Sequence, residues 1–367
     1  MSAETSVPSQ PIQVLMMPDY RVDNPYQILL AKALESNGVQ VHFPRGYRRV
    51  FPIWRTIKTS QQHFDVLHLH WISPYIKGEQ WLTKFIYSIK FLIDVLLTRR
   101  SGITVVWTIH NRISHDSKFP KLELGVRRIL VKLVKRLILH NHSTIAAIVQ
   151  DYRFDANKAI VIPIGHYRGI YQDLIDEQSA RKQLGLPSTG RIYLSQGMIR
   201  PYKGIERLLR VWRRNEHFFK KDTLLIVGKP LNSAYGQKIK QIAATIAGVI
   251  IYPEFVEDDR MHLFFSAATV VVLPFENILT SSSLVVAMSY GKPIIAPNLG
   301  GIQETLGEAD KLLYAPNNDQ ELFLALEKST KIDLKEIRKL VTKACNRLDW
   351  HEIGQKTLTL YRVALDI

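Results

Sequence analysis

Residues 274–283 read PFENILTSSS, and they join an apolar run at 267–273 to a second apolar run, LVVAMSY, at 284–290. The proline at the start of this stretch ends the first run, which predicts a buried strand, and Gly291 ends the second, which predicts a helix. Ser and Thr favour helix starts, where free backbone N–H groups and the positive end of the helix dipole attract anions. The four hydroxyl residues therefore predict an anion site at this helix start: Thr280, Ser281, Ser282 and Ser283.

A further strand and a glycine turn follow this helix. The apolar run Pro293–Ala296 is followed by the sequence Asn-Leu-Gly-Gly at 298–301 and by Glu304. A strand, a hydroxyl-lined helix start, a second strand and a glycine turn together predict a cradle for a nucleotide diphosphate.

The bulk composition is that of an ordinary globular protein. The chain has 367 residues, of which 46% are hydrophobic and 22% charged, and this length favours two domains. The single cysteine, Cys345, excludes an internal disulfide. The net charge of +16 is concentrated in residues 1–170, where 23 Lys and Arg face 11 Asp and Glu. Such a surface can attract nucleic acid, an anionic membrane or a phosphorylated substrate.

Both halves of the chain alternate between strand-like and helix-like segments. We expect strands at 12–16, 39–43, 65–71, 104–110, 144–149 and 159–164 in the first half, and at 192–196, 223–227 and 249–252 in the second. Helices are expected at 26–36, 204–214, 235–247, 258–267 and 351–365. Helices between strands place the strands in parallel sheets, so the pattern predicts an α/β protein with two Rossmann-like, doubly wound domains. We place the domains at 1–170 and 191–348, a hinge at 171–190 and a final helix, 349–367, that packs back toward the first domain.

Polar side chains follow several of the predicted strands, at the strand ends where open α/β sheets bind ligands. Imidazoles and carboxylates there suit general acid–base chemistry, and His110 is the best candidate for a base. The further catalytic candidates are His70 and Asp19, and the candidate residues for the acceptor or cleft are Asn24, Asn111, His166 and Arg168. Taken singly, each is more often a loop cap or a hydrogen-bonded core side chain, and the repetition of the pattern at four strand ends favours a site. No spacing matches HExxH or a Cys/His zinc pattern, so we expect no metal.

The segment GMIRPYKG at 197–204 supplies a second candidate phosphate site. Gly197 follows a strand, and Arg200 and Lys203 add a forked donor and a point charge, which together suit a diphosphate. A surface turn with solvated cations is the alternative. Neither GxxxxGK[ST] nor GxGxxG occurs, which excludes the usual ATPase and dehydrogenase phosphate loops.

Residues 77–100 and 121–142 are apolar at helical spacing with interleaved cations. Basic amphipathic helices of this kind lie on anionic membrane surfaces, although buried apolar faces with outward Lys and Arg give the same pattern. The most apolar stretch, 81–97, is short and charged for a membrane span, and the N-terminus lacks a signal-peptide pattern. We therefore expect a cytoplasmic protein that is peripheral at the inner face of the plasma membrane.

With these motifs assembled, the chain resembles the nucleotide-sugar glycosyltransferases of the GT-B fold. The segment at 197–204 is similar to their G-x-I-R-P-Y-K-G loop, and 273–304 is similar to their donor-binding block. The patterns DVLHLHW at 65–71, TIHN at 108–111 and GHYR at 165–168 are similar to those of bacterial exopolysaccharide transferases of the xanthan type.

The resemblance implies two domains facing a central cleft and a metal-independent hexosyltransferase without a cofactor. Its donor would be GDP-mannose, bound by Arg200, Lys203, Gly197, the hydroxyls at 280–283 and Glu304. Its acceptor would be a polyprenyl-diphosphate-linked or other glycan in exopolysaccharide biosynthesis, bound by the first domain. Val286 stands where a large retaining family has a glutamate, which leaves inversion or retention open. The alternatives are a nucleotide-sugar 2-epimerase and a retaining transferase of UDP-sugars, and no nucleic-acid-binding motif is found.

Overall fold

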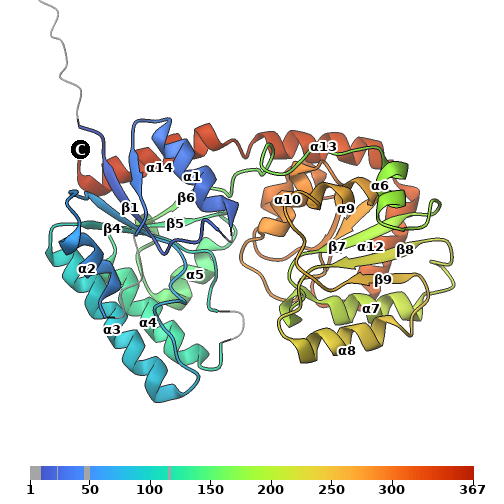
Figure 1. Ribbon diagram of the computed structural model, residues 1–367, viewed down its shortest axis with the longest axis horizontal. Coiled ribbons are helices and arrows are strands. Elements are labelled where there is room, and N and C mark those ends of the chain that lie inside the picture. Colours follow the sequence, from blue (N-terminus) through green and yellow to red (C-terminus); the bar gives the residue numbers. More distant parts are fainter. Residues whose placement is uncertain (1–9, 23, 45–49, 115–116) are drawn as a thin grey trace, which may run out of the picture. The chain divides into compact units, whose positions relative to one another are not determined.

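The computed structural model describes residues 10–22, 24–44, 50–114 and 117–367. Contacts divide the chain into two compact units (Figure 1). The first unit consists of residues 1–163 together with 350–367, and the second unit consists of residues 164–349.

The first unit is built on a six-stranded, wholly parallel sheet with the strand order β2-β1-β3-β4-β5-β6. Its strands are β1 (Gln13–Met17), β2 (Gln40–His42), β3 (Val66–Leu69), β4 (Thr104–Thr108), β5 (Arg136–Leu139) and β6 (Ala159–Val161). Its helices are α1 (Pro25–Glu35), α2 (Pro52–Thr59), α3 (Trp81–Arg100), α4 (Pro120–Leu133), α5 (Ile145–Tyr152) and α14 (Trp350–Leu365), and a 3₁₀ turn covers Ala156–Lys158.

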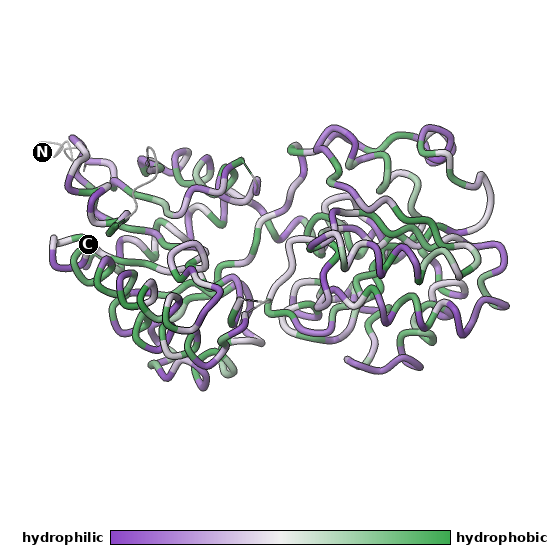
Figure 2. Tube along the Cα trace, turned by 60° about the horizontal axis from the view of Figure 1, so that its bottom comes forward, coloured by the Kyte–Doolittle hydropathy of each residue, from purple (hydrophilic) through white to green (hydrophobic). Residues whose placement is uncertain are grey.

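The central strands are apolar on both faces. Val105, Val106 and Trp107 are consecutive in β4 and all are buried. Parallel sheets in α/β proteins are covered by helices on both faces, so their strands are continuous hydrophobic runs rather than alternating ones. In the hydropathy colouring of Figure 2, green segments run through the interior of the second unit, and much of its outer surface is purple or white.

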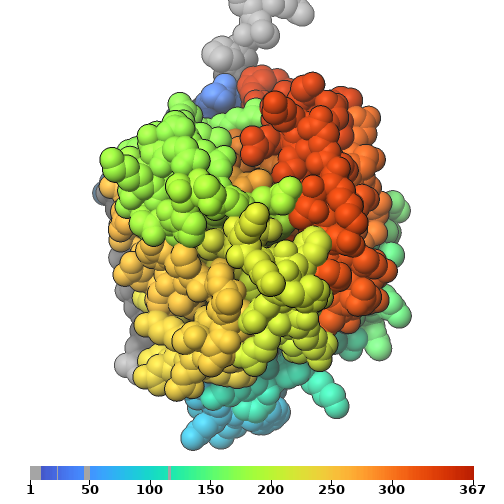
Figure 3. Space-filling view, turned by 90° about the vertical axis from the view of Figure 1, so that its right-hand side faces the viewer, coloured from blue at the N-terminus to red at the C-terminus, as the bar shows by residue number. Residues whose placement is uncertain are grey.

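The second unit repeats this architecture with the strand order β12-β11-β10-β7-β8-β9, again all parallel. Its strands are β7 (Ile192–Gln196), β8 (Thr223–Val227), β9 (Val249–Tyr252), β10 (Val270–Val272), β11 (Ile294–Pro297) and β12 (Leu313–Tyr314). Its helices are α6 (Glu177–Gln183), α7 (Ile205–Arg214), α8 (Ser233–Ala243), α9 (Met261–Ala267), α10 (Ser282–Ser289), α11 (Ile302–Leu306), α12 (Asp319–Lys331) and α13 (Leu334–Asn346), with 3₁₀ turns at Pro201–Lys203 and Gly307–Ala309. Figure 3 shows one face of this unit, with the segment that contains α6 in green.

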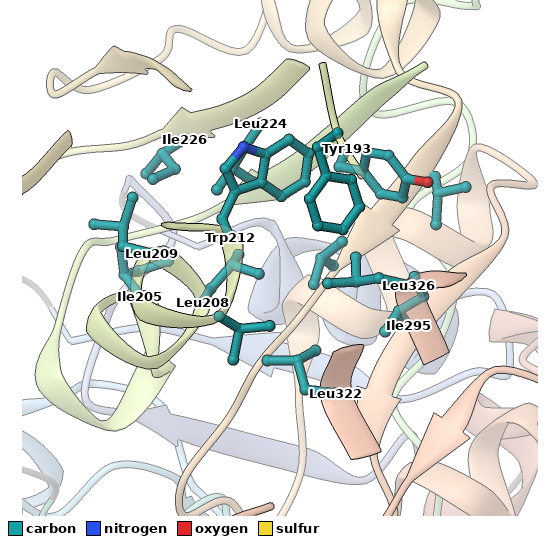
Figure 4. Packing of buried hydrophobic residues seen from close by; sticks show 14 of the residues in the cluster. Tyr193, Ile205, Leu208, Leu209, Trp212, Leu224, Ile226, Ile295, Leu322 and Leu326 are labelled. Carbon is teal, nitrogen blue, oxygen red and sulfur yellow. The ribbon is translucent and has the colours of Figure 1, made fainter. Parts of the chain in front are cut away.

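Aromatic stacking anchors one face of the second sheet. The Trp212 ring from α7 stacks on Phe219 with 4.0 Å between ring centroids, and Tyr193 of β7 meets Trp212 edge-on at 5.5 Å. Leucines and isoleucines from β8, α7 and α12 surround these rings (Figure 4). This cluster fixes α7 against the sheet, and α7 directly follows the loop that carries Arg200 and Lys203.

Two sequence predictions about the first unit are wrong. Residues 144–149, predicted as a strand, lie in helix α5, and the fifth strand is β5. Residues 121–142, predicted as one amphipathic helix, comprise nearly all of α4, which ends at Leu133, and then the buried strand β5. The short apolar segment RLIL at 136–139 carries a helical pattern in sequence, but its pairing with β4 and β6 makes it a strand. That part of the segment therefore has no surface to offer a membrane.

The C-terminal helix α14 belongs to the first unit and packs on α1. A Cβ at Gly354 would lie 2.4 Å from the carbonyl oxygen of Ala33, so this close helix contact requires glycine. Residues 171–190, predicted as a hinge, include α6 and lie within the second unit. No helix among the described residues is both long and apolar enough to cross a membrane.

Candidate active site

The four hydroxyl residues at the start of α10 have different roles. The Ser281 side chain caps the helix, because its Oγ accepts a hydrogen bond from the Leu284 N–H at 3.0 Å. Ser283 Oγ accepts a hydrogen bond from Lys203 Nζ at 2.9 Å. Ser282 is exposed and Thr280 is half-buried. The helix start thus combines a fixed cap with a hydroxyl that holds a cation beside the free N–H groups.

Lys203 is the central cation of this site. Its ammonium lies 4.8 Å from the centroid of the Phe275 ring, in addition to its hydrogen bond to Ser283. Burial, together with the neighbouring charge of Arg200, lowers the pKa of Lys203 to about 8. Arg200 is half-buried, with Nη2 at 3.6 Å from Met198 Sδ. The site therefore places two cations and a helix start within one unit, a combination that attracts a diphosphate.

Two glycines allow the 197–204 loop to lie close to α10 and to the segment before it. Gly204 has a φ of +70°, and a Cβ there would lie 1.8 Å from the carbonyl oxygen of Pro274. Gly197 has a φ of +121°, and its Cβ would lie 3.1 Å from Ser283 Oγ and 3.4 Å from Lys203 Nζ. Any side chain at these positions would separate the 197–204 loop from α10 or fill the space beside the lysine.

The glycine turn at 300–301 packs against the segment that precedes α10. The Gly301 N–H donates to the Leu279 carbonyl at 3.2 Å, and Glu304 is exposed on the short helix α11 that follows the turn. Val286 is buried in α10, and Glu276 Oε1 lies 3.7 Å from Arg207 Nη2. The carboxylate nearest in sequence to the hydroxyl run is thus directed to an arginine of α7.

In the first unit, the strand ends form a row of hydrogen-bonded imidazoles. His70 Nδ1 and His110 Nε2 are 3.1 Å apart, and His110 Nδ1 and His140 Nε2 are also 3.1 Å apart. His68 bridges Thr108 Oγ1 and the Tyr361 hydroxyl of α14, at 2.7 and 2.6 Å. The structure therefore brings the predicted residues His70 and His110 together.

The hydrogen bonds assign the tautomers of three rings. His140 Nδ1 lies 2.9 Å from the Ile162 carbonyl oxygen, which can only accept, so this nitrogen carries the proton and His140 Nε2 is an acceptor. His110 then donates through Nδ1, and its Nε2 accepts from His70 Nδ1. His70 Nε2 is left with a lone pair, and it is buried without a hydrogen-bond partner among the described residues.

All of these rings are held neutral. Burial lowers the pKa of His68 to about 3 and that of His140 to about 4. Burial, reinforced by the neighbouring rings, lowers the pKa of His70 and of His110 well below the usual range. His110 is the half-buried member of the row, and it stacks on Trp71 at 4.3 Å. Among the described residues, no three His, Cys, Asp or Glu side chains are arranged to hold a metal ion.

Asp19 and Asn24 follow β1, as predicted, but both have local partners. Asp19 forms an ion pair with Arg21 at 2.9 Å, and this hydrogen bond holds the pKa of the carboxyl below its usual range. Asn24 caps α1, because its Oδ1 accepts from the Tyr26 N–H at 3.0 Å.

The remaining predicted residues are distributed over both units. Asn111 follows His110 in the first unit, and its carbonyl oxygen accepts from the Tyr152 hydroxyl at 3.4 Å. His166 and Arg168 belong to the second unit. The Arg168 guanidinium donates to Asn346 Oδ1 of α13 at 2.6 Å, so this residue is tied to the C-terminal helix of its own unit.

His140 is a member of the imidazole row that the sequence analysis did not select. It lies just after β5, within the segment predicted as a single helix. The sequence signal that identifies it is the His-Asn-His run at 140–142, which follows a short apolar segment as polar residues follow the other strands of this sheet.

Comparison with known proteins identifies the class of enzyme to which the second unit is similar. Residues 176–346, which carry the 197–204 loop and the hydroxyl helix start, match the family model of glycosyl transferases group 1. The chain is a glycosyltransferase. The match covers most of the second unit, and the predicted resemblance to this class of enzyme is confirmed.

Two relatives are similar to this chain over more residues than the family model matches. The transferase is 27% identical over 308 residues to the GDP-mannose:glycolipid 4-beta-D-mannosyltransferase of Xanthomonas campestris, which covers 82% of this chain and 80% of that protein. It is 24% identical to the D-inositol 3-phosphate glycosyltransferase of Acidothermus cellulolyticus, over 82% of this chain and 68% of that protein. Both are transferases, and the epimerase alternative is not favoured.

Solved structures confirm the predicted GT-B fold. A glycosyltransferase from Rickettsia africae has a TM-score of 0.70 at 16% identity, covering 97% of this chain and 99% of that one. Anabaena HepE in complex with UDP has a TM-score of 0.71 at 16% identity, covering 95% and 99%.

Proposed function

We propose that this glycosyltransferase moves a mannosyl residue from GDP-mannose to a lipid-linked saccharide. The observation that carries the proposal is the pairing of Lys203 with Ser283 at the start of α10, beside Arg200. The Xanthomonas relative, whose name specifies GDP-mannose and a glycolipid, supports the choice of donor and acceptor.

The diphosphate site accounts for the leaving-group half of the reaction. As the bond between the anomeric carbon and the diphosphate oxygen breaks, negative charge develops on the departing diphosphate. Lys203, Arg200 and the N–H groups at the start of α10 are already oriented by the surrounding structure, so they stabilise that charge without a large reorganisation. Gly197 leaves the space that a phosphate group needs beside the lysine.

The acceptor half of the reaction requires a hydroxyl to lose a proton as it attacks the anomeric carbon. We assign this role to the strand ends of the first unit, with His110 or His70 as the base if the transfer inverts the anomeric centre. Burial lowers the pKa of both rings and keeps them neutral. The hydrogen bonds leave a lone pair on His70 Nε2, whereas His110 Nε2 accepts from His70 Nδ1, so His110 can take a proton only when that hydrogen bond breaks. Asp19, Asn24 and Asn111 are the nearby polar candidates for binding the acceptor.

The outer surface of α3 is the proposed contact with the membrane. Six apolar side chains of this helix are exposed: Trp81, Leu82, Phe85, Ile86, Ile89 and Ile93. Arg99 and Arg100 follow at the end of the same helix, and Ile129 of α4 is also exposed. An exposed apolar face with flanking cations and a tryptophan suits the interface of an anionic bilayer. The proposal places the protein at the inner face of the plasma membrane.

The direct test is transfer of radiolabelled mannose from GDP-mannose to a lipid-linked acceptor extracted from the producing cells. Separate Arg200→Ala and Lys203→Ala variants should each reduce kcat/KM by about tenfold to about 150-fold, the effect of losing a charged hydrogen bond of about 1.5–3 kcal/mol. Lys240→Ala is the matched control, because this exposed lysine of α8 lies outside the site. Unchanged turnover in both site variants would contradict the proposal.

A further inference from the structure

A cavity of about 340 Å³ lies within the first unit, and residues from α2, from α3 and from the end of β1 line it. This volume falls within the range of small-molecule pockets, about 300–1,000 Å³. Four aromatic rings line the cavity, from Phe51, Tyr75, Tyr87 and Phe91. Its wall is therefore predominantly apolar, and it includes Asp19, which was named above as a candidate for binding the acceptor.

The cavity has two features that point to a ligand. The Tyr75 hydroxyl is buried without a hydrogen-bond partner among the described residues, although its ring stacks on Phe91 with 5.3 Å between centroids. Phe51 has a φ of +46°, a left-handed conformation that a bulky residue adopts only when its surroundings hold it there. An unsatisfied polar atom and local strain at one cavity are typical of functional sites.

Helix α3 connects this cavity to the proposed membrane surface. Successive residues are rotated by about 100° around a helix axis, so the exposed apolar side chains from Trp81 to Ile86 span an arc of about 140°. The cavity-lining side chains Lys90, Asp94, Tyr87 and Phe91 occupy the next arc of about 100°. Ile86 and Lys90 stand at the border between the two arcs. The exposed apolar face of α3 and the cavity are therefore neighbours on this helix, and the Lys90 ammonium stands at the border between them, where it can meet the phosphate of a lipid whose chain enters the cavity.

The charged groups of the cavity define the other end of the ligand. Lys77 and Lys90 line the cavity and are exposed, and Lys90 Nζ lies 5.4 Å from the Tyr87 ring. The two acidic groups are both engaged: Asp94 accepts hydrogen bonds from the Ile53 and Trp54 N–H groups, and Asp19 pairs with Arg21. The cations are thus placed to bind an anionic headgroup at the edge of an apolar cavity.

We infer that this cavity binds the single hydrocarbon chain of a phosphorylated acceptor lipid, with its phosphate at Lys90 and Lys77. The inference rests on the proposed function, because it identifies this lipid as the carrier of the accepting sugar. The cavity also includes Asp19, which follows β1 at the strand ends that were assigned to the acceptor. A chain held here would present its headgroup toward those strand ends.

The test uses the full-length protein and farnesyl phosphate as a water-soluble probe, with binding measured by isothermal titration calorimetry. The titrations contain GDP in excess, which occupies the proposed diphosphate site of the second unit. Under this condition we expect saturable binding at one site, at least tenfold weaker binding of farnesol, and no measurable heat with inorganic phosphate. Equal binding of inorganic phosphate would overturn the inference, because it would mark a phosphate site without a chain. Tighter binding of dihexanoylphosphatidic acid would also overturn it, because it would mark a site for a two-chain bilayer lipid.

Paired variants locate the bound chain. Thr56 lines the cavity from α2, so Thr56→Phe should fill the space and weaken farnesyl phosphate binding at least tenfold, whereas Thr56→Val should leave the affinity nearly unchanged. Lys90→Glu should also weaken binding at least tenfold, and Arg100→Glu, the same charge reversal on the same helix, should not. Equal affinities within each pair would overturn the inference.

GDP-mannose binding, measured on the same variants, separates the two proposals. The diphosphate site lies in the second unit, so all four variants should retain the affinity of the unmodified protein for GDP-mannose, which also shows that they are folded. Mannosyl transfer without farnesyl phosphate binding would refute the lipid cavity alone. Farnesyl phosphate binding without any binding of GDP-mannose would refute the proposed donor alone.

Discussion

Donor binding should weaken as the pH rises through the pKa of Lys203. Burial and the charge of Arg200 lower this pKa to about 8 in the unliganded protein. A diphosphate binds the protonated ammonium and raises its pKa, so the affinity is fully present below pH 8 and is lost as the pH rises above it. Replacing Lys203 by Arg tests the origin of this dependence, because a guanidinium stays protonated throughout the range.

The size of the effect follows from the protonated fraction of Lys203. With a pKa of about 8, about nine-tenths of the lysines are protonated at pH 7 and about one-tenth at pH 9. If only the protonated form binds the donor, the apparent Kd rises about tenfold between these pH values and about another tenfold by pH 10. The tenfold rise corresponds to about 1.4 kcal/mol of binding free energy.

Isothermal titration of GDP-mannose at pH 7, 8, 9 and 10 measures the dependence directly. Ionisation of the ligand itself affects the native protein and Lys203→Arg equally, so the difference between the two pH profiles reports the lysine. We expect the native profile to bend near pH 8 and the Lys203→Arg profile to lack this bend. Identical profiles, or a native Kd that stays constant from pH 7 to pH 10, would refute the assignment of Lys203 to the diphosphate.

Three further outcomes are expected. Gly197→Ala should lower the free energy of unfolding by at least about 1 kcal/mol, because the φ of +121° at this position disfavours alanine. The same change should weaken GDP-mannose binding, and an unchanged affinity would show that the donor does not use the space beside Lys203. Glu123→Gln should cost about 3–5 kcal/mol in urea unfolding followed by tryptophan fluorescence, because it leaves the buried cations of Lys84 and Arg127 without their carboxylate. The ion pairs lower the pKa of Glu123 to about 2, so the free energy of unfolding of the native protein should fall as the pH drops from about 4.5 toward 2. The Glu123→Gln variant should lack this part of the pH dependence, and an equal fall in the variant would contradict the assignment. Combined Trp81→Ser and Phe85→Ser changes should weaken sedimentation with anionic vesicles at least tenfold relative to Val363→Ser, an exposed apolar position on α14.

Local sequence predicted the cluster of Gly197, Lys203 and Ser283 better than the row of imidazoles. The positions of Gly197, Lys203 and Ser283 depend on two short motifs, each of which lies between a strand and a helix that the pattern of apolar residues reveals. His140 depends on β5, whose four residues have no recognisable strand pattern of their own. Only its pairing with β4 and β6 makes this segment a strand, and such long-range contacts are not visible in a local window.

The same difference fits the position of the family-model match. Binding a diphosphate requires backbone N–H groups, glycines at close approaches and a cation, and few sequences satisfy these demands. The matched residues 176–346 accordingly lie wholly in the second unit. The proposed acceptor and lipid sites of the first unit instead depend on side chains contributed by β1, α2, α3 and the ends of β3, β4 and β5, which can be exchanged singly while the sheet is kept. Variants of Thr56 or Lys90 should therefore alter the choice of acceptor while the donor, bound in the other unit, stays the same.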